Sequence, residues 1–248
     1  MKILAFVNHV PDTETKVKVA ADGKTIDTAG VNFMLNPYDE YAVEEGLKLR
    51  EKFSGEVNVV SVGGDTHKEA LRKALAMGCD KAVLLKDPST RDSYAVARAL
   101  ADYTKEYSPD VVLCGKQSID YDDAQVGGLV AEMLGLPSIS VVVKLEIAAG
   151  AVVAEREIEG GNEVVHSKLP VVIMAQKGLN QPRYPSLKGI MESKRKQIEE
   201  RTISPVESKV EVLALKKPAA KPPGKIVGTD ASAVPELVRL LREEAKVI

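Results

Sequence analysis

Apolar and polar positions alternate along the first 137 residues in a repeating strand–helix order. Short apolar runs typical of buried parallel strands occupy Lys2–Val7, Val57–Val62, Lys81–Leu85 and Val111–Cys114. Between them, segments with one apolar face at helical spacing run from Asn36-Pro37 onward, around Ala70–Leu75, over Asp92–Tyr107 and from about Ala124 to Leu134. This alternation predicts an α/β fold with a three-layer, doubly wound and mostly parallel sheet.

A doubly wound sheet places its ligands outside the carboxyl ends of the strands, near the point where the strand order reverses. Three strand ends in this sequence carry small or polar residues and are therefore candidates: Phe6–Val10, Val62–Thr66 and Gly115–Val126. We expect these three segments to lie together and to form a binding site.

The pattern changes after residue 137. Short strands are indicated at Val141–Leu145, Val152–Glu157, Val164–Ser167 and Val171–Ala175, as a meander that extends the same sheet. Lys188–Arg201 is predicted as one helix with a basic run. Lys216–Lys225 is a proline-rich extended linker, and Asp230–Lys246 is an amphipathic helix that folds back or docks on a partner. The expected units are residues 1–201, an α/β domain, and residues 202–248, an arm with a helix.

Composition narrows the function classes. The 34 basic and 36 acidic side chains give a formal net charge of −2, which disfavours a dedicated nucleic-acid binder. No apolar run approaches the roughly 18 residues that membrane crossing requires, and the amino terminus does not read as a signal peptide. We therefore expect a cytoplasmic protein without membrane insertion, in which Cys79 and Cys114 are buried thiols.

Motifs for catalysis and metal binding are missing from the sequence. It holds no P-loop, no Gly-x-Gly-x-x-Gly after the first strand and no Gly-x-Ser-x-Gly elbow. His9, His67 and His166 lack neighbouring ligands at metal-binding spacing. We therefore predict no catalytic residues and no metal site.

Gly115–Gly128 is the stretch richest in candidate chemistry. It joins a strand end to a helix start, where free N–H groups suit a phosphate, while its Asp and Gln side chains suit a ribose or an adenine edge. Alternatively, Asp122 or Asp123 only caps the helix. Two other positions leave a similar choice: Asn36 is either a helix cap or a ligand contact, and Gly63-Gly64-Asp65 is either a close approach to a ligand or a tight turn.

A second candidate segment follows the last strand, from Leu179 to Pro185. Two prolines stiffen it, and Leu179 is placed where an exposed apolar tip would be. A rigid loop with an exposed leucine is a plausible anchor in a partner's pocket. The alternative is a leucine tucked under its own loop.

At these residues the sequence resembles the beta (small) subunits of electron-transfer flavoproteins. The resemblance runs from Met1 to about Arg201. It rests on Asn36–Glu45 (NPYDEYAVEE), Ala74–Asp80 (ALAMGCD), Gly115–Asp120 (GKQSID) and, most specifically, on Leu179–Tyr184 (LNQPRY) with Ile190-Met191 and the Lys194–Lys196 basic stretch. Together these segments are far more specific than any single short motif.

The resemblance implies an electron carrier and not an enzyme. Such a subunit has an adenine nucleotide alpha-hydrolase-like fold and pairs with a larger alpha subunit, with which it shares an FAD. It buries AMP in the common form or a second FAD in the electron-bifurcating form. Acyl-CoA dehydrogenases would donate electrons, and a quinone reductase or similar acceptor would receive them. A stand-alone ATP-binding stress-type protein is the alternative.

The resemblance also carries over site residues. The family's nucleotide contacts fall on Phe6, Asn36, Pro37, Tyr38, Asp39, Val62, Gly115, Lys116, Gln117, Ser118, Ile119, Asp120, Tyr121, Asp122, Asp123, Ala124, Gln125 and Val126. Its partner-recognition loop falls on Ala175, Gln176, Lys177, Gly178, Leu179, Asn180, Gln181, Pro182, Arg183 and Tyr184, with Leu179 as the anchor. Tyr38 falls where the family brings an aromatic ring near the flavin.

The helix start departs from both family patterns. AMP-binding members tend to carry Asn-Gln-Thr where this chain has Ala124-Gln125-Val126, and bifurcating members tend to read Gly-Asp-Thr-Ala-Gln-Val-Gly. Here Tyr121 and Asp123 replace the glycine and the threonine of the second pattern. Because a tyrosine there crowds the space for a second flavin, AMP is the preferred ligand.

Overall fold

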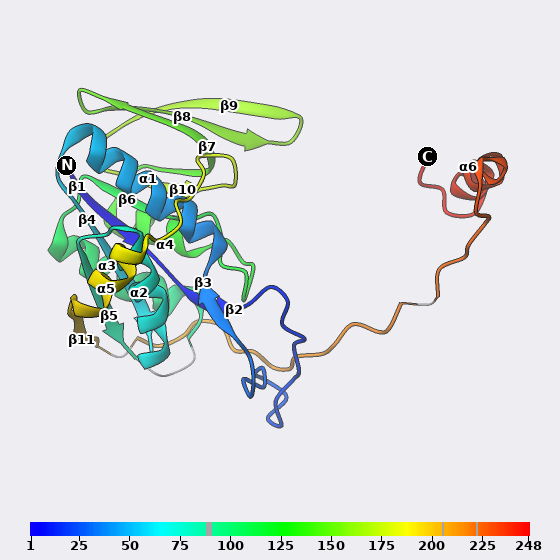
Figure 1. Cartoon of the computed structure of the whole chain (residues 1–248), viewed down its shortest axis with the longest axis horizontal. Coiled ribbons are helices and arrows are strands. Elements are labelled where there is room, and N and C mark those ends of the chain that lie inside the picture. Colours follow the sequence, from blue (N-terminus) through cyan, green and yellow to red (C-terminus); the bar gives the residue numbers. More distant parts are fainter. Residues whose placement is uncertain (88–90, 205, 222) are drawn as a thin grey trace.

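The computed structural model describes residues 1–87, 91–204, 206–221 and 223–248. One sheet organises the chain (Figure 1), with the strand order β11-β5-β4-β1-β6-β10-β7-β8-β9. Strands β11 through β7 in that order run parallel, whereas β8 and β9 are antiparallel additions. The bounds are β1 Lys2–Phe6, β4 Glu56–Gly63, β5 Lys81–Lys86, β6 Val111–Gly115, β7 Ser138–Ala148, β8 Ala151–Ile158, β9 Gly161–Lys168, β10 Val171–Ala175 and β11 Ile198–Thr202.

Helices cover both faces of the sheet because successive strand residues point to opposite sides. In β1, Ile3 packs in a cluster with Leu47 of α1 and Leu71 of α2. The next residue, Leu4, packs in a second cluster with Leu100 of α3 and Val130 of α4. The helices are α1 (Pro37–Phe53), α2 (Lys68–Met77), α3 (Ser93–Tyr107), α4 (Val126–Leu134) and α5 (Leu187–Arg195), of which α5 packs against α2. The expected fold class is confirmed.

The strand order reverses beside β1. The chain moves from β1 outward through β4 to β5, then returns across the sheet to β6 on the other side of β1. The carboxyl ends of β1 and β6 therefore form a topological switch point, which is where this architecture opens a crevice for a ligand.

Two element predictions were wrong. Lys188–Arg201 is not one helix, because α5 ends at Arg195 and Ile198–Thr202 forms β11. The strand is favoured because Ile198 is buried beside Ala82 of β5 and Glu200 reaches the ammonium of Lys86. The helix expected from Ala124 starts only at Val126, because Asp122 and Ala124 have positive φ angles of 59° and 54°. A small ribbon of β2 (His9–Pro11) and β3 (Phe33–Leu35) was not predicted.

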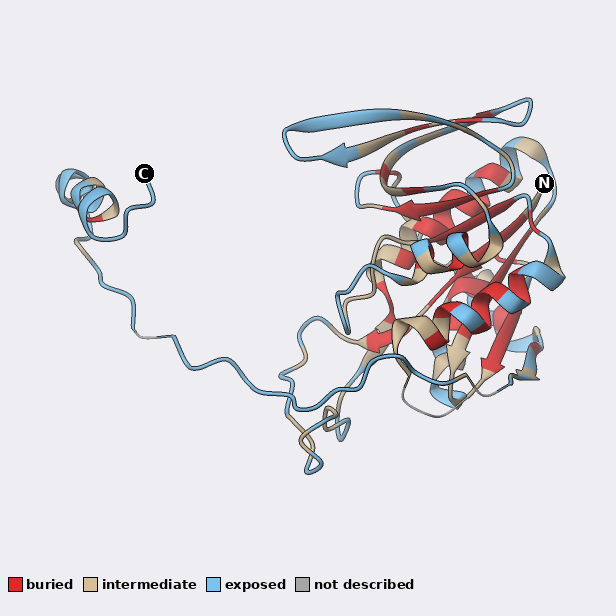
Figure 2. Ribbon diagram, turned by 180° about the vertical axis from the view of Figure 1, so that it is seen from behind, coloured by how far each residue is buried: buried red, intermediate tan, exposed pale blue. Residues whose placement is uncertain are grey.

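The carboxyl-terminal arm leaves the sheet after β11. It is mostly exposed and leads to a short 3₁₀ turn, η2 (Ala231–Ala233), and to α6 (Val234–Glu243), which lies apart from the body in both views (Figures 1 and 2). On its way the arm touches the turn near β2, where the Leu215 N–H donates to the Gly23 carbonyl at 2.8 Å. Across the described residues, no helix has the length and apolar character needed to cross a membrane.

Candidate nucleotide-binding site

A cavity of about 500 Å³ lies at the carboxyl ends of β1, β4, β5 and β6. Its walls come from Phe6–His9, Val60–His67 and Cys114–Ser118, together with residues of the loop that leads into α4. These are the strand ends that the sequence analysis selected, and the structure brings them together. Volumes of this order are typical of small-molecule and cofactor sites.

The structure divides the candidate nucleotide contacts into two groups. Residues that line the cavity are Phe6, Asp39, Val62, Gly115, Lys116, Gln117, Ser118, Asp120, Tyr121, Asp123, Ala124, Gln125 and Val126. Asn36, Pro37, Tyr38, Ile119 and Asp122 are not among the residues that line it.

Asp39 holds two strand ends together from the first turn of α1. Its carboxylate accepts the Asn8 N–H at 2.8 Å and the Gly115 N–H at 2.9 Å. The side chain is buried, and burial raises its pKa to about 7 despite these two hydrogen bonds. Gly115 is required here, since a Cβ at this position would lie 2.6 Å from the Asp39 Oδ1. Asp39 therefore fixes the spacing of β1 and β6 at the switch point.

The Asn36 side chain is turned toward the loop that follows β6. Its side chain makes no capping hydrogen bond to α1. Instead, the Nδ2 donates to the Gln117 carbonyl at 3.0 Å, and the Oδ1 accepts the Ile119 N–H at 3.4 Å. Asn36 is fully buried, so it anchors the 117–119 backbone to the start of α1.

The acidic residues before α4 do not cap that helix. Asp122 accepts a hydrogen bond from the Gln117 amide, and Asp123 accepts one from the Ser93 hydroxyl at the start of α3. Within the described chain no side chain caps α4. The two residues in left-handed backbone conformations, Asp122 and Ala124, are strained positions of the kind that cluster at functional sites.

Two histidines line the cavity beside β4 and β1. The rings of His9 and His67 lie 5.6 Å apart, and burial together with the neighbouring His9 lowers the pKa of His67 to about 4. The His67 ring packs against Gly63, where a Cβ would lie 2.3 Å from it, and Gly63-Gly64-Asp65 also lines the cavity. Sequence reasoning tested His9 and His67 only as metal ligands; across the described residues, no group of acidic, His and Cys side chains could hold a metal ion.

Sequence reasoning missed one wall of the cavity. Asp87 and Arg91–Ser93 follow β5 and line the site. Arg91 has a side chain only 6% exposed, in an ion pair with Asp87. The signal was available, because the carboxyl-end rule applies equally to the strand predicted at Lys81–Leu85.

The expected exposure of Leu179 is wrong. This residue is only 8% exposed and belongs to the buried cluster that contains Leu47. Exposed apolar side chains follow it instead: Tyr184 at 94%, Leu187 at 84% and Met191 at 61%. The apolar tip of this region is therefore formed by the end of the loop and the outer face of α5.

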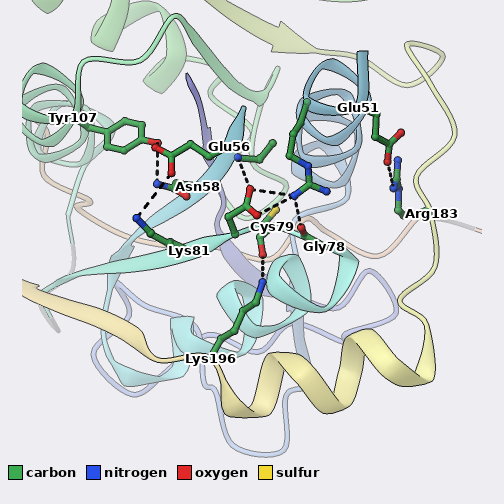
Figure 3. Close-up of polar contacts among 12 residues, drawn as sticks. Glu51, Glu56, Asn58, Gly78, Cys79, Lys81, Tyr107, Arg183 and Lys196 are labelled. Carbon is green, nitrogen blue, oxygen red and sulfur yellow. Dashed lines mark hydrogen bonds and ion pairs between the residues drawn. The ribbon is translucent and has the colours of Figure 1, made fainter. Parts of the chain in front are cut away.

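Two buried glutamates of α1, Glu44 and Glu45, bind side chains of the candidate partner loop. The Arg183 guanidinium donates to both oxygens of Glu44, at 2.8 and 2.9 Å. It also donates to Glu51 at 2.6 Å (Figure 3). The Asn180 amide donates to Glu45 at 2.9 Å. Arg183 and Asn180 thus face the protein, and they position the loop for the exposed side chains.

The remaining residues of the candidate partner loop are divided between core and surface. Ala175 is the buried end of β10, and Gln176 donates to Glu157 at 2.8 Å. Lys177, Gly178 and Gln181 are exposed, and Pro182 is half-buried. Beyond the loop, α5 is tied down where the Lys196 ammonium donates to the Cys79 carbonyl at 2.6 Å (Figure 3). Cys79 and Cys114 are free, buried thiols, as expected.

Comparison with known proteins places this architecture in a family. The model of the electron transfer flavoprotein domain matches residues 23–206. A protein of Bacillus subtilis named electron transfer flavoprotein subunit beta is 41% identical, with all of both chains covered. Its namesake in Syntrophomonas wolfei is 40% identical over all of this chain and 98% of its own. One from Oryza sativa, named as mitochondrial, is 38% identical over both full lengths. The chain therefore belongs to the electron transfer flavoprotein family and aligns with its beta subunits.

Proposed function

We propose that this chain is the small subunit of an electron-carrying heterodimer and that its cavity binds AMP. Family membership supports the electron-transfer role and association with an alpha subunit. The observation that supports the nucleotide assignment is the cavity at the switch point. Asp39 holds the ends of β1 and β6 together there, through hydrogen bonds from the Asn8 and Gly115 amides. A ligand that binds only the folded chain stabilises it by RT ln(1 + [L]/Kd).

AMP fits the site better than a second FAD. Tyr121 lines the cavity at the position where the bifurcating pattern has a glycine, and its ring takes up space that a second flavin would need. The Ala124–Gly127 segment agrees with that bifurcating pattern, so the second FAD stays the alternative ligand. A stand-alone ATP-binding protein is a weaker alternative, because the sequence has no glycine-rich phosphate loop.

Counting the ligands of the purified heterodimer tests this assignment. The complex is denatured, and the released nucleotides are separated by chromatography and quantified against protein. One FAD and one AMP per heterodimer are the expected result. Two FAD without AMP would replace AMP by the second flavin, and a single FAD with no other nucleotide would overturn the proposal for the cavity.

The alpha subunit is proposed to cover the arm, residues 202–248. The outer face of α6 leaves Val234 52% and Leu237 44% exposed, as expected for a helix that packs on another chain. Tyr38 lies beside Lys116 of the cavity wall, whose ammonium is 5.2 Å from the Tyr38 ring centre. In this arrangement the small subunit helps to hold the FAD of the alpha subunit and catalyses no bond change itself.

Acyl-CoA dehydrogenases are the proposed electron donors and a quinone reductase or similar protein the acceptor. The docking surface assigned to them consists of Tyr184, Leu187 and Met191, which are exposed and apolar. Exposed apolar side chains on a rigid base are favourable anchors, because little conformational entropy is lost when they are buried by a partner.

A further inference from the structure

We propose that residues 206–215 form a strap that the body of this chain holds by itself, so that the tether to α6 begins only at Lys216. The inference rests on the proposed pairing with an alpha subunit, because it specifies which part of the arm is left for that partner. Two separate sites on the body hold the strap, and each of them binds backbone N–H groups of the strap as well as its side chains.

The first site is Asp92, the residue that caps α3. One oxygen of its carboxylate accepts the Ala95 N–H at 2.8 Å, as an N-cap does. The other oxygen accepts the N–H groups of Lys209 and Val210, the latter at 2.8 Å. The Asp92 N–H in turn donates to the Ser208 hydroxyl at 3.4 Å. A single residue therefore joins the start of α3 to three consecutive residues of the strap.

The charge of Asp92 strengthens this site. Hydrogen bonds to an ionised carboxylate are roughly twice as strong as those between neutral groups. Burial disfavours the ionised form, but the backbone N–H groups around the carboxylate outweigh that effect and hold the pKa of Asp92 below its ordinary value. The carboxylate is therefore ionised at neutral pH, as the strap requires. A weaker contact comes from the Lys209 ammonium, which lies 5.8 Å from the Tyr94 ring centre.

The second site is the turn at Gly23-Lys24, in the loop between β2 and β3. The Leu215 N–H donates to the Gly23 carbonyl at 2.8 Å, and the Lys24 ammonium pairs with Glu211 at 2.8 Å. Figure 1 shows the arm running along the body to this turn before it leaves toward α6. Beyond Leu215, the described residues up to Ile226 make no hydrogen bond or ion pair with the body.

The two sites shorten the tether. The chain that joins the sheet to η2 spans residues 203–230, and the strap limits the tether to residues 216–230. Because the effective concentration of a tethered module falls roughly as the −3/2 power of tether length, the strap raises that of α6 at its partner about two- to threefold. The prolines of Lys216–Lys225 stiffen the tether further. The body thus sets the point from which α6 reaches the alpha subunit.

Amide hydrogen exchange of the full chain, resolved by NMR, tests the strap before any partner is added. Relative to their intrinsic rates, the amides of Lys209 and Val210 should exchange roughly 10–100-fold more slowly than those of residues 216–221, as expected for hydrogen bonds to a charged group. Asp92→Asn and Asp92→Ser each keep one oxygen for the α3 cap and lack the second acceptor oxygen. Both should remove the protection at Lys209 and Val210 and keep that at Ala95.

Asp102→Asn is the control, since it removes an exposed carboxyl of the same helix that pairs with Arg98. It should leave all of these exchange rates unchanged. Amide exchange is the readout because Asp92 also lines the cavity, so nucleotide binding would not separate a loosened strap from an altered cavity wall.

Two results would overturn the inference. One is a wild type in which Lys209 and Val210 exchange as fast as residues 216–221, and the other is full protection of these two amides in both Asp92 variants. The wild-type rates decide by themselves if the variants also lose the protection at Ala95.

Repeating the exchange measurement on the heterodimer, by mass spectrometry of its peptides, separates this inference from the proposed function. Protection of the strap only in the heterodimer would contradict a strap held by the body, while the alpha subunit would remain the cover of the arm. Protection in the isolated chain, with no association with an alpha subunit, would support the strap and overturn the proposed pairing.

Discussion

The cavity and the partner loop differ in how their buried charged side chains are paired. Around the cavity, Arg91, His67 and Ser61 keep buried polar atoms that find no partner among the described residues. Beneath the loop, the carboxylate of Glu44 receives three hydrogen bonds from the Arg183 guanidinium and backbone, so its burial is fully compensated. Apolar side chains then lie on the outside of the loop and not on the inside.

The difference follows from what each surface is built to meet. A site for a small polar ligand leaves hydrogen-bonding capacity inside a closed space, which the ligand satisfies when it binds. A docking surface for a protein needs exposed apolar area held rigidly, and here the Glu44–Arg183 ion pair beneath the loop supplies that rigid base. Experiments that disturb one region without the other can break or sharpen this contrast.

The largest expected effect is the pH dependence that Asp39 adds to the cavity. Its pKa is raised to about 7 in the folded chain from an ordinary value of 3.8. A raised pKa means that the folded state holds the proton more tightly, so the contribution is complete below pH 4 and is lost as pH rises to 7. The free energy of unfolding should therefore fall over this window by up to about 4 kcal/mol from this group.

Urea denaturation of the full chain at a series of pH values measures the effect. Asp39→Asn cannot ionise, and its unfolding free energy should lack this decline. Asp102→Asn is the control, since it removes an exposed carboxyl on α3 that pairs with Arg98. Parallel pH profiles for the wild type and Asp39→Asn would show that the pKa of Asp39 is the same in the folded and the unfolded chain, against this prediction.

A smaller effect is expected from the polar base of the loop. Arg183→Leu leaves the buried Glu44 carboxylate without its main partner, and the loss of one partner of a buried pair costs about 3 kcal/mol. Glu51→Gln removes only the exposed ion pair between Arg183 and Glu51, and it should lower the unfolding free energy by less than about 1 kcal/mol. Denaturation of both variants at pH 7 compares them. Equal destabilisation would mean that the buried pair contributes no more than a surface pair.

Much of the fold could be predicted because it depends on local patterns. Apart from Lys2, the runs at Lys2–Val7 and Val111–Cys114 are apolar throughout. Such runs are typical of strands covered on both faces, and they can be recognised without tertiary context. The segment at Ile198–Thr202 is different. One buried isoleucine among charged residues reads as the end of a helix, and only the neighbouring β5 makes it a strand.

The sequence was enough to predict which strand ends form the candidate site. It was not enough to predict which way the side chains near those ends point. The carboxyl-end rule located Phe6, Val62 and Gly115, but nothing local shows that Asn36 turns toward the loop that follows β6. Leu179 is the clearest case, because a lone leucine in a polar loop looks the same in sequence whether it turns inward or outward. The answer depends on the space beneath the loop, which distant residues such as Leu47 create.

The smallest expected effect separates the two leucines of this region. Leu187 is 84% exposed, so Leu187→Ser should leave the unfolding free energy within about 0.5 kcal/mol of the wild type. It should nevertheless weaken docking roughly 5–10-fold, because a buried apolar anchor is lost only in the complex. Steady-state reduction of the heterodimer by an acyl-CoA dehydrogenase measures this as a raised KM for the flavoprotein with an unchanged kcat.

Leu179→Ala is the contrasting variant: it opens a cavity in the core and should cost about 3 kcal/mol of stability. The contrary result would be a raised KM in Leu179→Ala at full stability, together with a normal KM in Leu187→Ser. Leu179 would then be the anchor, and the assignment of the inner and outer faces of the loop would be reversed. The contrast with the nucleotide cavity depends on that assignment.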